Sequence, residues 1–326
     1  VLSISLSLSL SISKNQYQHR YNLLNSNVIQ TRSATTTNFT SHPNRTFAIH
    51  DAVMDNLALD AEYSYIVGNP SCGFSEPRTF RTQRTTYPQK HVLLGDMGAA
   101  FAFSLCKDCS YEESCVCKNT SAGIISEVES ADMILHVGDF AYDLDSNNGD
   151  TADRFFTNIE NVTSRVPYMI SHGNHEDGDV SLARFTESWR NMPTNNGTVT
   201  SINGDAPNNW FFSWVLFDTH SIIIITRAHT HTHTQDAGLV HYVSISTEIQ
   251  GGAMLTRGGN DLIKRQFEFL ENDLKKANLN RENVPCTFFL SLSFSLSLSL
   301  SLSHTHTHIN RDCGERSSKH VLFMRR

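Results

Sequence analysis

From residue 90 onward, short apolar runs alternate with amphipathic segments. Three of the runs have the length of buried strands: Val92–Leu94, Met133–Val137 and Tyr168–Ser171. Between them, Ser121–Glu129 and Asp153–Ile159 place apolar residues at helical spacing. Strands that alternate with helices predict a largely parallel sheet covered by helices, which is an α/β (or α+β) architecture.

The region before residue 90 shows strand periodicity instead. Tyr63, Tyr65 and Val67 alternate with polar residues, and Gly, Pro and Asn separate the short segments. This pattern predicts a partial all-β domain over residues 33–88. Further along the chain, a longer amphipathic helix is predicted at Asp261–Ala277. Its expected apolar face consists of Leu262, Phe267, Leu270 and Leu274.

Two kinds of dipeptide repeat interrupt the chain. Ser alternates with Leu or Ile in residues 1–13 and 290–303, and His alternates with Thr in residues 229–234 and 304–308. The Ser–Leu alternation fits a strand, and His-rich tracts can bind metal. Dinucleotide repeats in DNA also translate into these patterns, so we interpret the tracts as translated repeats.

On this interpretation, residues 1–32 and 287–326 are low-complexity segments without an assigned fold, and residues 215–237 are a retained insert. The segments on either side of that insert, Asn209–Trp214 and Gly238–Glu248, are predicted to form two hairpin-like strands once it is excluded.

Composition excludes some partners and favours a compartment. The net charge of -7 gives no basic surface for nucleic acid. No apolar run reaches the length of about 18 residues that a membrane span needs. Seven cysteines and five Asn-x-Ser/Thr sequons favour a secreted protein or one of the secretory pathway, including the vacuole. The sequons begin at Asn38, Asn44, Asn119, Asn161 and Asn196.

Two details bear on that compartment. The chain begins at Val1 without a signal peptide, so we expect the natural N-terminus to precede it. Cys106, Cys109, Cys115 and Cys117 are expected to form local disulfides, and a zinc knuckle is the alternative.

Each predicted strand of the α/β region runs into Gly and then into a side chain that can bind a metal. Asp96 follows the first strand, Asp139 and Tyr142 follow the second, and Asn174 and His175 follow the third. The carboxyl ends of such strands meet at one edge of a sheet, where ligands gather. Singly, each motif is also typical of a turn or a packed aromatic. Together they predict a two-metal site for phosphoryl transfer.

The residue types suggest a division of roles. Asp139 is expected to bridge two ions because its strand should be central. A Tyr142 phenolate favours a ferric ion, whereas Asn174 offers a neutral oxygen to a divalent ion. His175 is the candidate catalytic residue, which would bind the phosphate or protonate the leaving oxygen. The sequence predicts structural roles for His136, His172 and, as a core or interface residue, His241.

Three motifs carry a family resemblance. Gly95–Gly98, Gly138–Tyr142 and Gly173–Glu176 resemble the first three of five signature motifs of purple acid phosphatases, which are calcineurin-like metallophosphoesterases. Ile49–Thr82 resembles the end of that family's fibronectin-III-like N-terminal domain. The resemblance covers roughly residues 46 to 285 outside the insert, and it places the metallophosphoesterase domain at residues 89–286.

The resemblance implies a fold, a cofactor and a reaction. The fold would be a β-sandwich flanked by helices, preceded by the partial fibronectin-III-like domain. Asp96, Asp139 and Tyr142 would bind Fe(III), and Asp139 and Asn174 would bind a divalent Zn, Mn or Fe ion. The reaction would be acid hydrolysis of small phosphomonoester substrates, with His175 facing the substrate.

The chain also departs from the family pattern. The last two motifs would supply three more histidine ligands, and nothing after Cys286 matches them. We therefore expect weak metal binding and impaired activity. The alternatives are a related metallophosphodiesterase, which Tyr142 argues against, and a non-catalytic secreted binding module that keeps only the scaffold.

Overall fold

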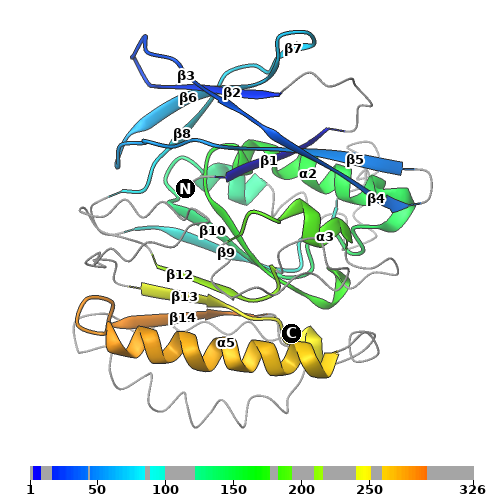
Figure 1. The fold of residues 1–326 in the computed structure, drawn as a ribbon, viewed down its shortest axis with the longest axis vertical. Helices are drawn as coiled ribbons and strands as arrows, with labels where there is room; N and C mark the ends of the chain where they lie inside the picture. Colours follow the sequence, from blue (N-terminus) through cyan, green and yellow to red (C-terminus); the bar gives the residue numbers. More distant parts are fainter. Residues whose placement is uncertain are drawn as a thin grey trace. The chain divides into compact units, whose positions relative to one another are not determined.

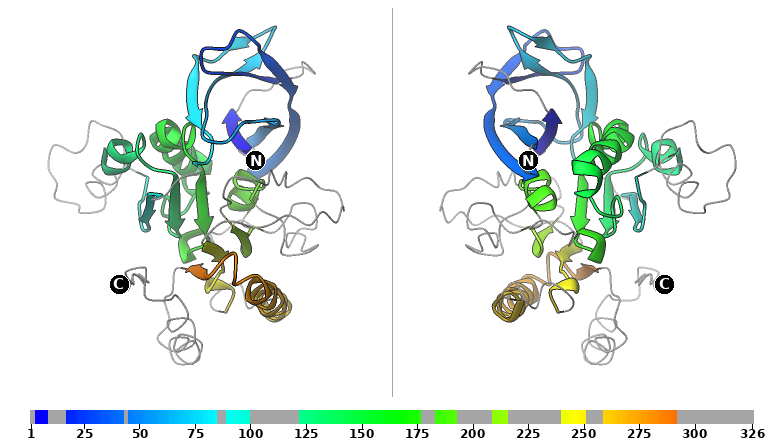
Figure 2. Two further views of the ribbon diagram at one scale, coloured as in Figure 1. Left: turned by 90° about the vertical axis from the view of Figure 1, so that its left-hand side faces the viewer. Right: turned by 90° about the vertical axis from the view of Figure 1, so that its right-hand side faces the viewer.

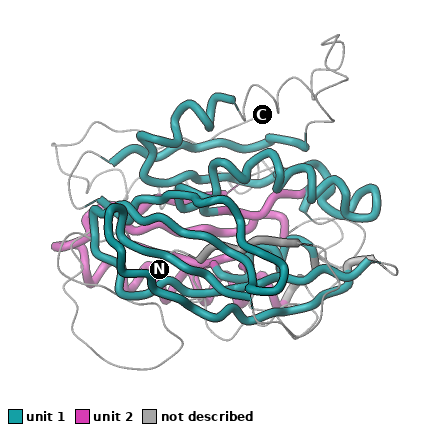
Figure 3. The backbone as a smooth tube through the Cα atoms, turned by 90° about the horizontal axis from the view of Figure 1, so that it is seen from above, with its two compact units in different colours: residues 1–169, 175–191 teal, residues 170–174, 192–326 magenta. Residues whose placement is uncertain are grey.

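The computed structural model describes residues 3–8, 17–42, 45–84, 89–99, 122–176, 183–192, 209–215, 240–250 and 259–291. The chain divides into two compact units (Figure 3). The first consists of residues 1–169 and 175–191, and the second of residues 170–174 and 192–326. Each unit is described by itself below.

The first unit begins with an all-β domain made of two sheets (Figures 1 and 2). One sheet has the order β1-β5-β4, with β1 at Ser3–Leu8, β4 at Thr35–His42 and β5 at Arg45–Val53. The other has the order β3-β2-β6-β7, and β8 also pairs with β6. Its strands are β2 (Gln18–Leu23), β3 (Gln30–Ser33), β6 (Glu62–Asn69), β7 (Gly73–Phe74) and β8 (Arg78–Arg81).

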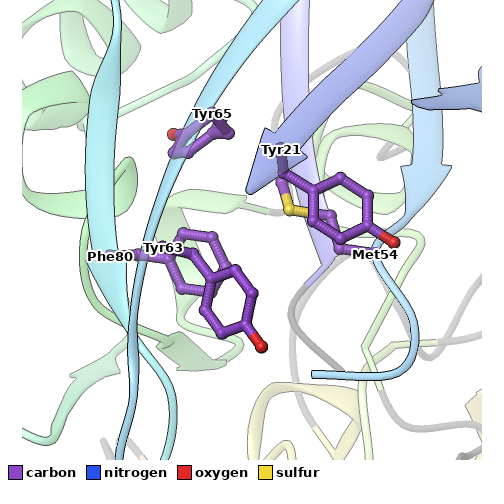
Figure 4. Packing of buried hydrophobic residues seen from close by; sticks show 5 residues of the cluster. All are labelled: Tyr21, Met54, Tyr63, Tyr65 and Phe80. Atoms are coloured by element: carbon purple, nitrogen blue, oxygen red, sulfur yellow. The ribbon is translucent and has the colours of Figure 1, made fainter. Parts of the chain in front are cut away.

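Aromatic side chains form the core of this domain. Tyr63 and Tyr65 both point inward from β6, as their alternation predicted, and both rings pack against Phe80 of β8 (Figure 4). Tyr21 and Met54 complete the buried cluster. The Tyr21 hydroxyl donates to the backbone oxygen of Asp55 at 3.1 Å, so its polar end is satisfied at the margin of the core.

Strands β1 and β2, and all of β3 except Ser33, lie within residues 1–32, for which the sequence predicts no fold. The Ser–Leu tract supplies β1, which pairs antiparallel with β5 from Ser3 opposite Val53 to Leu8 opposite Ala48. An alternating tract can do this because its period of two matches that of a strand. The described β domain is therefore more complete than the partial one predicted for residues 33–88.

The strands predicted after residue 90 are confirmed. Strands β9 (His91–Leu94), β10 (Met133–Val137) and β11 (Tyr168–Ser171) form a sheet in the order β11-β10-β9. Strand β10 is central and fully buried, and it pairs in parallel with β9. Residues 122–127 and α2 (Asp150–Thr163) are helical, as predicted for these regions.

Two histidines of this region are structural, as predicted. His136 of β10 and His172, just after β11, are both completely buried, and burial lowers the pKa of each to about 3. His136 shares a hydrogen bond with the Tyr168 hydroxyl. His172 contacts Ser246 Oγ at 3.2 Å within the second unit. Both imidazoles are therefore neutral near pH 7.

The β domain is attached to α2 at both ends of the helix. Near its C-terminal end, the Tyr65 hydroxyl donates to the backbone oxygen of Ser164 at 2.8 Å, and Arg78 pairs with Glu160. Near its N-terminal end, Arg45 pairs with Asp150 and Asp153. Asp153 also pairs with the buried Arg184 of α3 (Ala183–Ser188).

In the second unit, β12 (Phe212–Val215), β13 (Val240–Ser244) and β14 (Cys286–Leu290) form one sheet. The segments that flank the predicted insert do pair antiparallel, as expected, with Phe212 opposite Ser244. Residues 216–237 of that insert, the Cys106–Cys117 segment and residues 292–326 lie outside the described residues. The short helices η1 (Ser146–Gly149), η2 (Asn174–Glu176) and η3 (Glu248–Gln250) complete the described chain.

Helix α5 (Gly259–Leu279) confirms the predicted helix but corrects its apolar face. Phe267 is 67% exposed, whereas Gln266 and Phe269 are buried. Gln266 occupies the inner face because its side-chain amide forms two 2.8 Å hydrogen bonds with the backbone of Ser246. A polar residue that satisfies backbone groups in this way is stable inside a core.

His241 has the core role that was predicted. Its Nε2 lies 2.6 Å from Asp273 of α5, and Ser213 Oγ donates to the other oxygen of that carboxylate at 2.5 Å. This network joins α5 to β12 and β13.

Among the helices of the described ranges, none is long and apolar enough to cross a membrane.

Candidate metal centre

Four of the five predicted site residues lie in the first unit, in the loops that follow β9, β10 and β11. Tyr142 donates its hydroxyl hydrogen to Asp96 Oδ1 at 2.8 Å. The backbone N–H of His175 donates to Asp139 Oδ1 at 3.1 Å. The structure therefore brings Asp96, Asp139, Tyr142 and His175 together, and Asn174 directly precedes His175 in the chain.

The loops after β9 and β10 lie against each other. The backbone N–H groups of Asp96 and Met97 donate to the carbonyl oxygens of Gly138 and Asp139 at 3.3 and 3.1 Å. Gly95 permits this approach, because a Cβ atom there would lie 2.8 Å from the carbonyl oxygen of Val137. This explains why a glycine precedes Asp96.

The backbone is strained at the site. Asp96, Asp139, Tyr142 and Asp143 all have positive φ angles, between 52° and 69°. Such left-handed conformations are uncommon for residues other than glycine and cluster at functional sites. Asp and Asn adopt them more easily than other side chains, whereas Tyr142 is a bulky residue held there by its surroundings.

The side chains present fit a bound cation. Asp139 is only 1% exposed, and its Oδ2 has no hydrogen-bond partner among the described residues. Burial raises the pKa of this carboxyl group, and the charge of Asp96 raises it further. The buried Oδ1 of Asn174 likewise lacks a partner among the described residues. Buried oxygens without donors are what a metal ion would satisfy.

The described carboxylate, imidazole and thiol side chains do not by themselves form a cluster that could hold a metal ion. In the described ranges, no group of three or more His, Cys, Asp or Glu side chains is placed to hold an ion. The predicted ligands accordingly include the Tyr142 phenol and the Asn174 amide besides the carboxylates of Asp96 and Asp139. Hard oxygen donors of these kinds suit ferric and divalent ions.

His175 is oriented by a residue that the sequence analysis did not identify. Its Nδ1 lies 3.0 Å from Asp143 Oδ1, and its ring packs 4.5 Å from the Tyr142 ring, centroid to centroid. The Asp143 contact therefore orients the imidazole ring through Nδ1. In the sequence, the only indication of this role of Asp143 is that it directly follows Tyr142.

Glu176 is a second residue that the site assignment missed. Its buried carboxylate accepts hydrogen bonds from the backbone N–H groups of Asp139, at 2.8 Å, and Phe140, at 2.9 Å. These bonds fix the backbone of Asp139 in its strained conformation. Glu176 closes the Gly173–Glu176 motif, which was the signal in the sequence.

Replacing Glu176 with Gln is expected to weaken metal binding about tenfold, because one backbone N–H loses its acceptor and the Asp139 loop loosens. Titration calorimetry with Zn(II) measures the change. Glu160→Gln is the matched control, since it removes a carboxylate from the same unit away from the site, and its affinity should stay within about twofold of the parent. Equal affinities for Glu176→Gln and the parent would contradict the positioning role.

Two family models match the chain. The model for the N-terminal domain of purple acid phosphatase matches residues 6–82, and the model for calcineurin-like phosphoesterase matches residues 92–308. The first match begins within β1 and includes β2 and β3. The second begins at β9 and includes all the predicted site residues.

Individual proteins agree with these matches. Acid phosphatase type 7 of Mus musculus is 31% identical over 243 residues, which are 74% of this chain and 44% of that protein. Probable inactive purple acid phosphatase 9 of Arabidopsis thaliana is 27% identical, over 71% of this chain and 34% of that protein. The chain spans less than half the length of these curated relatives.

A solved structure has the same fold. It is a purple acid phosphatase from yellow lupin (Lupinus luteus) seeds, with a TM-score of 0.56 and 22% identity over 89% of this chain and 48% of that chain. At this identity the likeness supports the fold. The α/β fold with a preceding all-β domain, expected from the sequence, is thereby confirmed.

Proposed function

We propose a function from the fact that this chain belongs to the calcineurin-like phosphoesterases and, among them, to the purple acid phosphatases. Its site is built for metal-assisted hydrolysis of phosphate monoesters. The observation that carries the proposal is the Asp139 carboxylate. It is buried, one of its oxygens has no partner among the described residues, and it stands beside the Asp96–Tyr142 pair. A carboxylate in this state is suited to an ion.

Each residue then has a role. Asp96, Asp139 and Tyr142 would hold Fe(III), and Asp139 and Asn174 would hold a divalent Zn, Mn or Fe ion. When bound, such ions activate water and neutralise the charge on a phosphoryl group. Tyr142 would give up the hydrogen that it now donates to Asp96. His175, held through Nδ1 by Asp143, would present Nε2 to the phosphate or to the leaving oxygen.

We further propose that this chain binds its second ion weakly and turns over slowly. The residues assigned here give three side chains to the first ion but only Asp139 and Asn174 to the second. The histidine motifs that the family resemblance implies have no match in residues 287–326. Several relatives of comparable identity carry the name "probable inactive purple acid phosphatase".

Two alternatives rest on specific observations. A barley protein named nucleotide pyrophosphatase/phosphodiesterase is 29% identical over 108 residues, which supports a diesterase. The incomplete second ligand set supports a non-catalytic binding module. The Tyr142–Asp96 contact favours the ferric monoesterase over both. Secretion is proposed from the sequons and cysteines.

The test loads the purified chain with Fe(III) and Zn(II). We expect a visible tyrosinate-to-iron band that disappears in Tyr142→Phe, together with slow hydrolysis of p-nitrophenyl phosphate at about pH 5. Faster hydrolysis of a diester substrate would favour the diesterase. Absence of the band in the folded parent would overturn the ferric site, and rapid monoester turnover would overturn the proposed impairment.

A further inference from the structure

The segment from Asp139 to Gly149, here called the site loop, is strained at both ends. Asp139, Tyr142 and Asp143 are left-handed near its start. At its end, Asn147, Asn148 and Gly149 have φ angles of 55°, 58° and 83°. Left-handed conformations are uncommon for residues other than glycine, and a bulky residue such as Tyr142 adopts them least readily, so other parts of the protein hold the loop in place.

The start of the site loop is held by Glu176, as described above. The end is held by Arg45, which lies on β5 of the N-terminal β domain. Arg45 Nη1 donates to the backbone oxygen of Asn148 at 2.7 Å and to Asp150 Oδ1 at 2.6 Å, and Nη2 pairs with Asp153. The Arg45 side chain is largely buried. Its planar guanidinium group can thus bind the last turn of the loop and the first turn of α2 at the same time.

Phe47, two residues along β5, restrains the same end of the loop. A Cβ atom added to Gly149 would lie 3.1 Å from the Phe47 ring, and the Arg45 guanidinium stacks 4.7 Å from that ring. Gly149 therefore suits its position both through its positive φ and through its lack of a side chain. The β domain and the end of the site loop fit closely at this point.

We propose that Arg45 is a positioning residue for the metal centre. By fixing Asn148 and the first turn of α2, it keeps the site loop in the strained conformation that presents Tyr142 and Asp143. This gives the N-terminal β domain a part in the site although it contributes no metal ligand. The inference rests on the proposed function only where metal binding is concerned.

A second ion pair separates this role from simple attachment of the β domain. Arg78 of β8 pairs with Glu160, toward the other end of the same helix, and lies near Ser164 Oγ at 3.3 Å. Arg78 and Arg45 both join the β domain to α2, but only Arg45 contacts the site loop. Arg78→Gln is therefore the matched control for Arg45→Gln.

Hydrogen–deuterium exchange of the metal-free proteins tests the positioning role directly. We expect amide exchange in peptides covering residues 139–149 to be about tenfold faster in Arg45→Gln than in the parent, because the loop opens locally. Arg78→Gln should leave these peptides unchanged. The exchange rate in Arg45→Lys should lie between those of the parent and Arg45→Gln. A lysine ammonium group can reach one acceptor but lacks the several N–H donors of the planar guanidinium group.

Metal titration is the second measurement. Arg45→Gln should lower the affinity for Fe(III) about tenfold and shift the tyrosinate-to-iron band, while Arg78→Gln should change neither. Should Arg45→Gln fail to fold, Arg45→Lys keeps the charge but cannot contact Asn148, Asp150 and Asp153 together, and faster exchange in residues 139–149 than in the parent is then the expected result.

The outcomes are distinct. Faster exchange confined to residues 139–149 in Arg45→Gln supports the positioning role, whether or not the proteins bind iron. A parent protein that does not bind iron would overturn the proposed function and leave the positioning role standing. Unchanged exchange in the loop, or equal acceleration in Arg45→Gln and Arg78→Gln, would overturn the positioning role.

Discussion

Asparagine in place of Asp139 is expected to abolish tight metal binding while making the metal-free protein more stable. The carboxyl group is buried beside Asp96, and both effects raise its pKa above the ordinary value of 3.8. Its ionised form is therefore disfavoured in the folded protein. An asparagine removes that charge and keeps an oxygen that can accept from the His175 N–H. Loss of a direct ligand should cost at least about 100-fold in metal affinity.

The sign of the stability effect depends on pH. A raised carboxyl pKa means that the folded protein holds the proton more tightly than the unfolded chain. The destabilisation is therefore absent below pH 3.8, grows as the pH rises from 3.8 to the raised pKa, and is constant above it. Urea unfolding of metal-free Asp139→Asn should show a gain over the parent at pH 7 that vanishes at about pH 3.

An exposed carboxylate provides the control for this substitution. Glu129 is 80% exposed in its side chain, so Glu129→Gln should change neither metal affinity nor stability beyond experimental scatter. A metal-free Asp139→Asn protein that is less stable than the parent at pH 7 would contradict the account of Asp139 as a destabilising buried charge.

Acidification is expected to destabilise the fold through His136. Burial lowers the pKa of this imidazole from 6.5 to about 3, so the unfolded chain takes up a proton that the folded protein does not. Stability is lost as the pH falls below 6.5. The difference between the two pKa values corresponds to a loss of about 2 kcal/mol at pH 5 and about 4 kcal/mol at pH 3 for this residue.

A pair of variants isolates the contribution of His136. Tyr168→Phe keeps the imidazole and should keep the pH dependence, whereas the double change His136→Leu with Tyr168→Phe removes both polar partners. Between pH 7.5 and pH 5, the unfolding free energy of the double variant should fall by about 2 kcal/mol less than that of Tyr168→Phe. Parallel pH profiles for these two proteins would show that His136 does not titrate as described.

Much of the site could be predicted because its parts are local in sequence. Asp96, Asp139 and Tyr142 each follow a short apolar run, and neighbouring strands bring their carboxyl ends together. The central position of β10 also followed from the pattern of three strands. Asn174 remains a predicted ligand, supported by its buried oxygen.

Other features could not be predicted, because their partners are not encoded by periodicity. Glu176 and Arg45 act on backbone groups, and Arg45 lies 103 residues from Asn148. On α5, Phe267 was preferred to Gln266 because hydrophobic spacing gives no sign of a buried amide that binds backbone. Strand β2 was missed because its two inward residues, His19 and Tyr21, are not aliphatic.

The left-handed backbone at Asp96 and Asp139, the two proposed carboxylate ligands, has an evolutionary consequence. Asp96 and Asp139 occupy conformations that asparagine adopts as readily as aspartate. One nucleotide change converts an aspartate codon into an asparagine codon, so a lineage can lose a ligand without straining its backbone. At Asp139 the metal-free fold is even expected to gain stability. Selection for folding alone is therefore not expected to preserve these two aspartates, and gene duplicates of such a protein can lose them long before they lose their structure.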